Sequence, residues 1–185
     1  VSKAYQIMTE GHYSQLPVVD SDNKLIGLVT EKLLAEVNPS SATSLSVYEI
    51  NYLLSKTKVQ DIMKTGIFKI NKDALIEDAA IIMKENRISS LPVVEGDNYL
   101  AGIITRTDIF KAFIDIMGVK ATGTRIAITT EDKVGVLADI TSILAQHNIN
   151  IRNITDISEN GKSEITIKVR SLDATAAVED IKAKG

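Results

Sequence analysis

The chain repeats itself once, without a gap, at a spacing of 75 residues. Residues 4–34 read AYQIMTEGHYSQLPVVDSDNKLIGLVTEKLL, and residues 79–109 read AAIIMKENRISSLPVVEGDNYLAGIITRTDI. Both copies contain Leu-Pro-Val-Val, an Asp-Asn turn and a Gly-apolar-apolar-Thr segment. The sequence therefore predicts one fold unit that is built twice.

The two copies differ at one chemically important position. Three residues after the shared Thr, the first copy has Leu33 and the second has Asp108. An acid that is present in one copy and missing from the other predicts that a polar ligand binds to the second copy.

The second copy shows the full pattern of the unit. Phe68 and Ile70 alternate with polar residues as a short strand, and Asp73 is placed to cap a helix. Two strands and another helix follow, which makes the order strand, helix, strand, strand, helix. In the first copy the stretch equivalent to 59–78 falls before residue 4 and most of it lies outside this sequence, so we expect this copy to be N-terminally truncated here.

A separate helix is predicted between the copies. Ser46 and Glu49 have the spacing of a capping box, and Val47, Ile50 and Leu54 follow at helical spacing. We expect this helix to pack between elements or between subunits.

A different unit begins at Thr124, after a linker of residues 118–123. Its pattern predicts a strand at 125–129, a helix at 135–147, strands at 148–157 and 163–170 around an Asn-Gly turn, and a helix from about Asp173. In the strand at 163–170, Ile165, Ile167 and Val169 alternate with polar residues and are expected to face inward. This βαββα order is one strand short of a ferredoxin-like βαββαβ sandwich, so the last strand is expected to be missing.

The composition argues against several functions. The net charge is −3 with both signs interspersed, so neither nucleic acid nor a membrane surface is an expected partner. There is no cysteine, and His12 and His147 are the only histidines. Because no nucleophile with an adjacent base and no metal-ligand spacing is visible, we expect no catalytic residue and no metal site.

The best candidate site lies where a strand ends and a helix begins, at Thr105. Free backbone N–H groups and the Thr hydroxyl suit an anion there. Asp108, one turn into the helix, is placed to accept hydrogen bonds from a ribose diol. The alternative is plain helix capping by Thr105, with Asp108 complementing the helix dipole.

Taken together, the repeated motif and the opening Asp61-Ile62-Met63 resemble a tandem pair of cystathionine β-synthase (CBS) domains. The resemblance implies regulatory binding of an adenosine derivative, namely AMP, ADP, ATP or S-adenosylmethionine, with no catalytic cofactor. It implies that Asp108 holds the ribose and that Thr105 lies near the phosphate or ribose. The residues that it places around the base are Gly66, Ile67, Ser90 and Pro92. Since the first copy lacks the acid, about one adenosine ligand is expected per chain.

The C-terminal unit resembles an ACT domain through the loop of residues 131–137, EDKVGVL, although Val134 stands where proline is common in that family. The resemblance implies an amino acid or other small effector at the interface between two such domains. An ACT domain that only dimerises is the alternative. The implied contacts are Asp132, Gly135, Val136, Leu137, Asn150 and Ile151.

The order of the domains, with the insertion at 38–56, resembles the bacterial acetoin utilisation protein B family. We therefore expect a cytoplasmic, homodimeric, non-catalytic sensor with α/β (α+β) architecture. The alternatives are a regulatory fragment of a larger metabolic enzyme or transporter, and a purely structural dimerisation module. The predicted parts are a partial first CBS domain at 1–36, an inserted helix and linker at 37–58, a second CBS domain at 59–117, a linker at 118–123 and an ACT domain at 124–185.

Overall fold

The computed structural model describes residues 1–37, 49 and 56–184. The chain divides into two compact units, Val1–Ile109 and Phe110–Gly185, which are described separately below. Most of the helix predicted between the repeats, including Ser46 and Val47, lies outside the described residues.

The first copy consists of α1 (Ser2–Gly11), β1 (Gln15–Val19), β2 (Leu25–Thr30) and α2 (Glu31–Val37). Its two strands are antiparallel neighbours. Apolar residues of both helices and of β2 meet in one buried cluster. This cluster contains Ala4, Met8, Val29 and Leu34.

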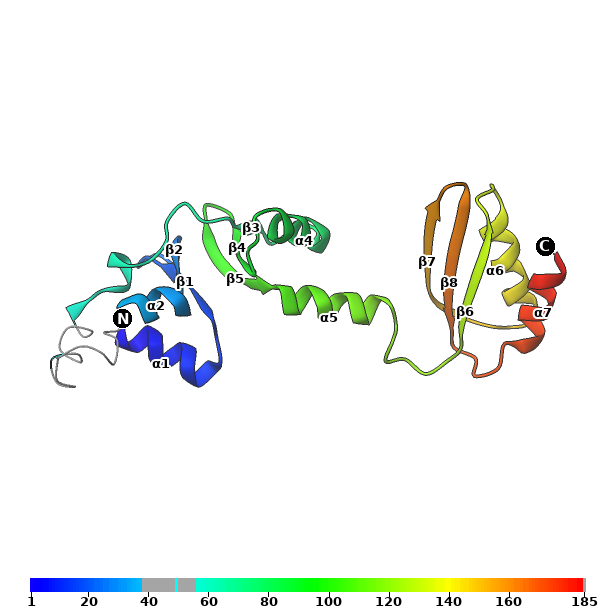
Figure 1. Cartoon of the computed structure of the whole chain (residues 1–185), viewed down its shortest axis with the longest axis horizontal. Coiled ribbons are helices and arrows are strands. Elements are labelled where there is room, and N and C mark those ends of the chain that lie inside the picture. Colours follow the sequence, from blue (N-terminus) through cyan, green and yellow to red (C-terminus); the bar gives the residue numbers. More distant parts are fainter. Residues whose placement is uncertain (38–48, 50–55, 185) are drawn as a thin grey trace. The chain divides into compact units, whose positions relative to one another are not determined.

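The second copy has the complete unit. It contains the 3-10 turn η1 (Val59–Asp61). The strands β3 (Ile70–Asn71), β4 (Ser90–Glu95) and β5 (Tyr99–Thr105) and the helices α4 (Ile76–Glu85) and α5 (Arg106–Ile116) are labelled in Figure 1. Its sheet has the order β3-β4-β5, with β3 parallel and β5 antiparallel to β4. The predicted order of strand, helix, strand, strand, helix is confirmed.

Two local predictions in this unit are wrong. The helix does not begin at a cap formed by Asp73, because the N–H of Asp73 donates to the Asn71 side chain and closes a turn. Instead α4 begins after Leu75, whose N–H donates to the Asp78 carboxylate at 3.3 Å. Phe68 is exposed and lies before β3 rather than in it.

The two copies contact each other through their equivalent turns. The N–H of Leu25 donates to the Asn98 carbonyl at 2.9 Å, and the N–H of Leu100 donates to the Asn23 carbonyl at 3.0 Å. Both Asn residues have positive φ, 63° and 69°, a conformation that Asn tolerates better than most residues. Since each residue's partner is the repeat equivalent of the other's, the contact has pseudo-two-fold symmetry.

The start of the second repeat unit packs on the first copy. Val59 and Ile62 lie against the first copy's buried cluster. The backbone N–H and C=O of Lys64 both bond to Leu28 on β2, each at 2.9 Å. Residues 59–64 therefore cover the first copy, although the sequence pattern assigns them to the second.

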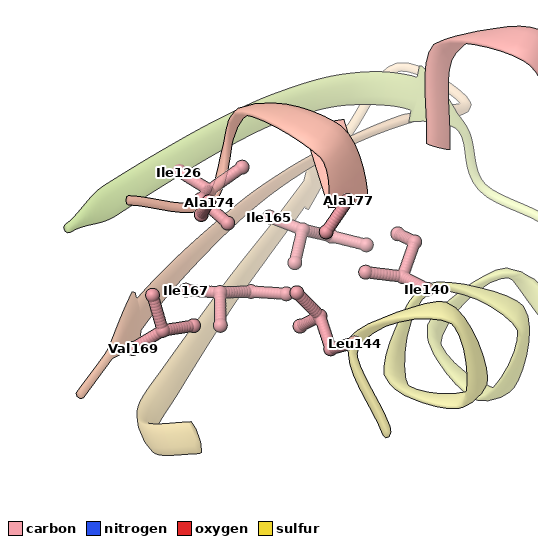
Figure 2. Packing of buried hydrophobic residues seen from close by; sticks show 8 residues of the cluster. All are labelled: Ile126, Ile140, Leu144, Ile165, Ile167, Val169, Ala174 and Ala177. Atoms are coloured by element: carbon pink, nitrogen blue, oxygen red, sulfur yellow. The ribbon is translucent and has the colours of Figure 1, made fainter. Parts of the chain in front are cut away.

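The C-terminal unit contains β6 (Arg125–Glu131), α6 (Val136–Gln146), β7 (Ile151–Glu159), β8 (Lys162–Val169) and α7 (Thr175–Lys184). The sheet order is β6-β8-β7, with neighbouring strands antiparallel. Both helices cover one face of this sheet (Figure 1). Figure 2 shows the buried apolar residues between the layers, to which β8 contributes Ile165, Ile167 and Val169 as predicted.

Among the residues that the structure describes, no helix combines the length and the apolar character that crossing a membrane requires.

Candidate functional site

The acid of the repeated motif lies at the junction between β5 and α5. Oδ2 of Asp108 accepts hydrogen bonds from the backbone N–H of Thr105 at 2.8 Å and from its hydroxyl at 2.7 Å. The N–H of Asp108 lies 3.3 Å from the Thr105 hydroxyl oxygen. The carboxylate therefore caps the first turn of α5, and the residue is exposed at the surface.

The first copy keeps only half of this arrangement. The N–H of Leu33 donates to the hydroxyl oxygen of Thr30 at 3.2 Å, which reproduces the Thr cap. The Leu33 side chain, however, packs against the first copy's buried cluster. An apolar side chain turned toward the core cannot accept a hydrogen bond, so the two motifs are chemically different.

Ser90 and Pro92 lie on β4 beside the strand that carries Thr105. Ser90 faces Thr105 in the strand register, and Pro92 faces Ile103. The structure thus brings Ser90, Thr105 and Asp108 to one end of the sheet.

The Ser90 hydroxyl is already engaged by the first copy. It donates to Oε1 of Gln15 at 2.5 Å, while Nε2 of Gln15 donates to the Ser89 hydroxyl at 2.7 Å. Ser90 is only 6 % exposed, so this bond satisfies a buried polar group. Sequence reasoning missed Gln15, although its position 75 residues before Ser90 was the available signal.

Gly66 and Ile67 follow a segment that is fixed to the first copy. Lys64, two residues before Gly66, is bonded to Leu28 on β2. Gly66 has φ 63°, and a Cβ at this position would meet no atom of the described part of the chain within 4 Å. Gly66 and Ile67 therefore follow a segment that is bonded to β2 of the first copy, whereas Thr105 lies at the end of β5 in the second copy.

Arg106 is a second residue that sequence reasoning missed. It follows Thr105 directly, and its backbone N–H donates to the Ser89 carbonyl at 3.0 Å. Its Nε donates to the Ile88 carbonyl at 3.1 Å. These two hydrogen bonds hold the positively charged Arg106 at the N-terminus of α5. Both this charge and the helix dipole favour an anion there.

The loop predicted to bind an effector leads from β6 into α6. Asp132 is held by its N–H, which donates to the Gly161 carbonyl at 3.0 Å. The hydrogen bond and positive charge of Lys133 hold the pKa of Glu131 below its usual range. Gly135 has φ 97° directly before α6, a backbone conformation that suits glycine, and a Cβ added there would meet no atom of the described residues within 4 Å.

The other predicted effector residues lie at the opposite end of the same sheet. Glu131 pairs with Lys162 at one end of β8, and Ile151 pairs with Val169 at the other. Seven residues of strand separate these partners, which corresponds to about 23 Å. One chain therefore does not bring Asp132 and Ile151 together.

A cavity of about 380 Å³ lies along β6 between the two helices of this unit. Of the six predicted effector residues, Val136 is the one that lines it. Asp139, Lys182 and Lys184 supply charges at its wall, and Lys184 bonds to Asp139 at 2.8 Å.

The histidines take structural positions. His12 ends α1 with φ 54°, and His147 ends α6 with Nε2 2.7 Å from Oδ2 of Asp180. Within residues 1–37, 49 and 56–184, no three His, Asp or Glu side chains are grouped as metal ligands.

Comparison with known families agrees with this architecture. The CBS domain model matches residues 1–38 and 59–115, and the ACT domain model matches residues 124–185. The chain belongs to the CBS domain family. It carries a tandem CBS pair followed by an ACT domain.

Curated relatives match this CBS protein over its CBS pair. The chloroplastic CBS domain-containing protein CBSX1 of Arabidopsis thaliana is 34 % identical over 133 residues, which cover 63 % of this chain and 56 % of the relative. Inosine-5'-monophosphate dehydrogenase of Methanocaldococcus jannaschii is 33 % identical over 112 residues, which cover 60 % of this chain and 19 % of the enzyme. The chain thus spans about half of the first relative and about a fifth of the second.

Solved structures show the same fold for the CBS pair. CBSX2 in complex with AMP is 30 % identical with a TM-score of 0.51, covering 63 % of this chain and 83 % of that one. A Vibrio cholerae protein assigned to acetoin utilization (AcuB) is 27 % identical with a TM-score of 0.52, covering 64 % of this chain and 79 % of that one.

Proposed function

We propose that this CBS protein is a non-catalytic regulatory sensor that binds one adenosine-containing ligand at Asp108. The observation that carries the proposal is the asymmetry between the repeats. An exposed carboxylate stands at the motif of the second copy, while Leu33 is packed against the core of the first.

The chemistry around Asp108 fits a nucleoside phosphate. A carboxylate accepts hydrogen bonds from a ribose diol, and such charge-assisted bonds are stronger than neutral ones. Arg106 and the N-terminus of the 11-residue helix α5 stand beside it and favour the phosphate. In this proposal Gly66, Ile67, Pro92 and Ser90 border the base, and the hydrogen bond to Gln15 holds the Ser90 hydroxyl in place.

AMP is the first ligand to test, because the structure of CBSX2 contains it. Isothermal titration with AMP, ADP, ATP and S-adenosylmethionine should give about one site per chain for at least one of them. Asp108→Ala should weaken that binding by about tenfold or more. Ligand affinity unchanged by Asp108→Ala would refute the assignment.

The ACT domain supports a second binding proposal. The β8 partners of Glu131 and Ile151 lie about 23 Å apart along the strand, so a site that uses both Asp132 and Ile151 requires two chains. We propose a homodimer with an amino acid or another small effector between paired ACT domains. Nucleotide affinity measured with and without a panel of amino acids tests the coupling, for which a change of about 1–3 kcal/mol is typical. Unchanged affinity would mean that the two domains act independently.

The pathway served by this sensor is also a proposal. The likeness to the Vibrio cholerae protein supports a role in acetoin utilisation. A cytoplasmic location is part of this proposal. The small share of the dehydrogenase that is matched supports the alternative, a regulatory part of a larger enzyme. Deleting the gene and measuring growth on acetoin tests the first, and the length of the complete gene product tests the second.

A further inference from the structure

Another cavity of the C-terminal unit lies where the segment after α5 turns back over β7. Its volume is about 350 Å³, and it lies between residues 114–121 and the strand residues Arg152 and Asn153. Gly118 follows α5 with φ 61°, the left-handed conformation in which helices commonly end. A Cβ added to Gly118 would lie 3.2 Å from Oδ1 of Asn153 and 3.4 Å from Cδ of Arg152, so the turn rests directly on the strand.

Side chains of the sheet hold this segment on both sides of the turn. The Thr155 hydroxyl donates to Sδ of Met117 at 3.7 Å. Nζ of Lys168 donates to the Gly123 carbonyl at 2.8 Å. The walls of the cavity therefore belong to one unit of one chain.

An irregularity of β7 brings two neighbouring residues to the same cavity. Side chains of consecutive strand residues normally point to opposite faces of a sheet. The register of β7 against β8 shifts between Ile151 and Asn153, with Arg152 between them, so the alternation is interrupted there. Arg152 and Asn153 both line the cavity as a result. Such bulges re-aim side chains and are common beside functional sites.

The polar groups of this cavity lack partners within the part of the chain that the structure describes. Oδ1 of Asn153 is buried and accepts no hydrogen bond from these residues, which is rare for a buried carbonyl oxygen. Asp115, Lys120 and Arg152 stand exposed at the rim and form no side-chain hydrogen bond or ion pair with the described residues. The cavity thus combines an acceptor that needs a donor with one negative and two positive charges.

These groups define the chemistry of a ligand. The two cations favour a carboxylate, which the guanidinium of Arg152 can hold with two parallel hydrogen bonds. Oδ1 of Asn153 would accept a hydrogen bond from a donor beside that carboxylate, and Asp115 favours a donor with positive charge. The rest of the lining offers apolar surface to a short aliphatic chain, through Ile114, Ile116 and Ala121.

We propose that this cavity binds a small aliphatic carboxylate that carries an amino or hydroxyl group next to its carboxyl group. The volume lies in the range of small-molecule sites, about 300–1,000 Å³. The site differs from the effector site proposed between paired ACT domains, because Asp132, Asn150 and Ile151 lie outside its lining. It needs no second chain, and its ligand would join the segment after α5 to β7.

The first experiment compares three probes with one carbon skeleton. Leucine carries an ammonium group beside the carboxylate, leucic acid carries a hydroxyl group, and isocaproate carries neither. Each is titrated into the isotope-labelled 185-residue chain, and the amide signals are followed by NMR. We expect leucine or leucic acid to shift the signals of Gly118, Lys120 and Asn153, with an affinity about tenfold or more above that of isocaproate, because isocaproate cannot donate to Asn153.

Three results of this titration would overturn the proposal. The first is the absence of saturable shifts with both leucine and leucic acid. The second is an equal affinity for isocaproate. The third is a set of shifts confined to Asp132, Asn150 and Ile151, because the ligand would then occupy the proposed ACT interface.

The second experiment tests the charges with matched variants. Arg152→Gln should weaken binding by about tenfold or more. The control Arg125→Gln removes the same charge from β6, outside the cavity, and should leave the affinity unchanged. Equal losses in both variants would show attraction by net charge alone and would overturn the site. Asp115→Asn identifies the donor, since it should weaken leucine, whose ammonium is charged, and leave leucic acid unaffected.

Discussion

Asp108→Asn separates two roles that the structure gives to one carboxylate. In the free protein Oδ2 of Asp108 accepts two hydrogen bonds from Thr105 and caps α5. Asn retains one side-chain oxygen as an acceptor for this cap. The substitution removes the negative charge and one of the two acceptor oxygens to which a ribose diol would donate.

The two effects have different magnitudes. Loss of the charge near the N-terminus of α5 should cost about 0.3–1 kcal/mol of unfolding free energy. Loss of a hydrogen bond to a charged group should cost about 1.5–3 kcal/mol of binding, a decrease of roughly 10- to 150-fold in affinity. Asp108→Ala should lose the same binding together with about 0.5–2 kcal/mol of stability, because the cap disappears as well.

The assay pairs calorimetric titration of the adenosine ligand with urea unfolding followed by circular dichroism. The matched control is Asp78→Asn, since Asp78 accepts a hydrogen bond from the N–H of Leu75 at the start of α4. This control should lose a similar amount of stability and no affinity. If Asp108→Asn bound the ligand as tightly as the wild type, or if Asp78→Asn weakened binding equally, the role of the Asp108 charge would be refuted.

Three further predictions concern stability. Gln15→Ala should lower the free energy of unfolding by about 1–3 kcal/mol in urea, because it leaves the buried Ser90 hydroxyl without its acceptor. Adding Ser90→Ala should recover part of that loss, and a double variant without any recovery would contradict the pairing. Gly135→Ala should cost about 1–2 kcal/mol from the positive φ alone, so an unchanged urea midpoint would show that the loop relaxes freely. The hydroxyl and backbone N–H of Thr175 hold the pKa of Asp173 below its usual range, so this ionised carboxylate stabilises the fold above the unfolded-state pKa. That contribution should disappear as the pH falls through the depressed folded-state pKa, and urea midpoints between pH 5 and pH 2 should fall more steeply for the wild type than for Asp173→Asn.

Much of the fold could be read from local patterns. The 75-residue repeat predicted two equivalent units, and their pseudo-two-fold contact confirms that relation. The alternating apolar residues of β8 predicted its buried face, because side chains of a strand alternate between faces. Helix α6 was predicted within one residue at each end, since Gly135 and His147 are strong end signals.

Other features could not be read locally. The start of α4 was misplaced because Asn71 and Asp73 form their own turn, which competes with a helix cap. The capping and ligand interpretations of Asp108 also remained open, since both use the same residue at the same spacing. The structure shows the cap, and the ligand role stays a prediction.

By itself, the sequence determined the duplication, the order of the elements and the loss of the acid at Leu33, because each is recorded in residue types at fixed spacing. Only the tertiary structure decided which surfaces those elements cover. It placed residues 59–64 on the first copy and engaged Ser90 through Gln15. These contacts join residues far apart in the chain, and neither propensity nor periodicity encodes them.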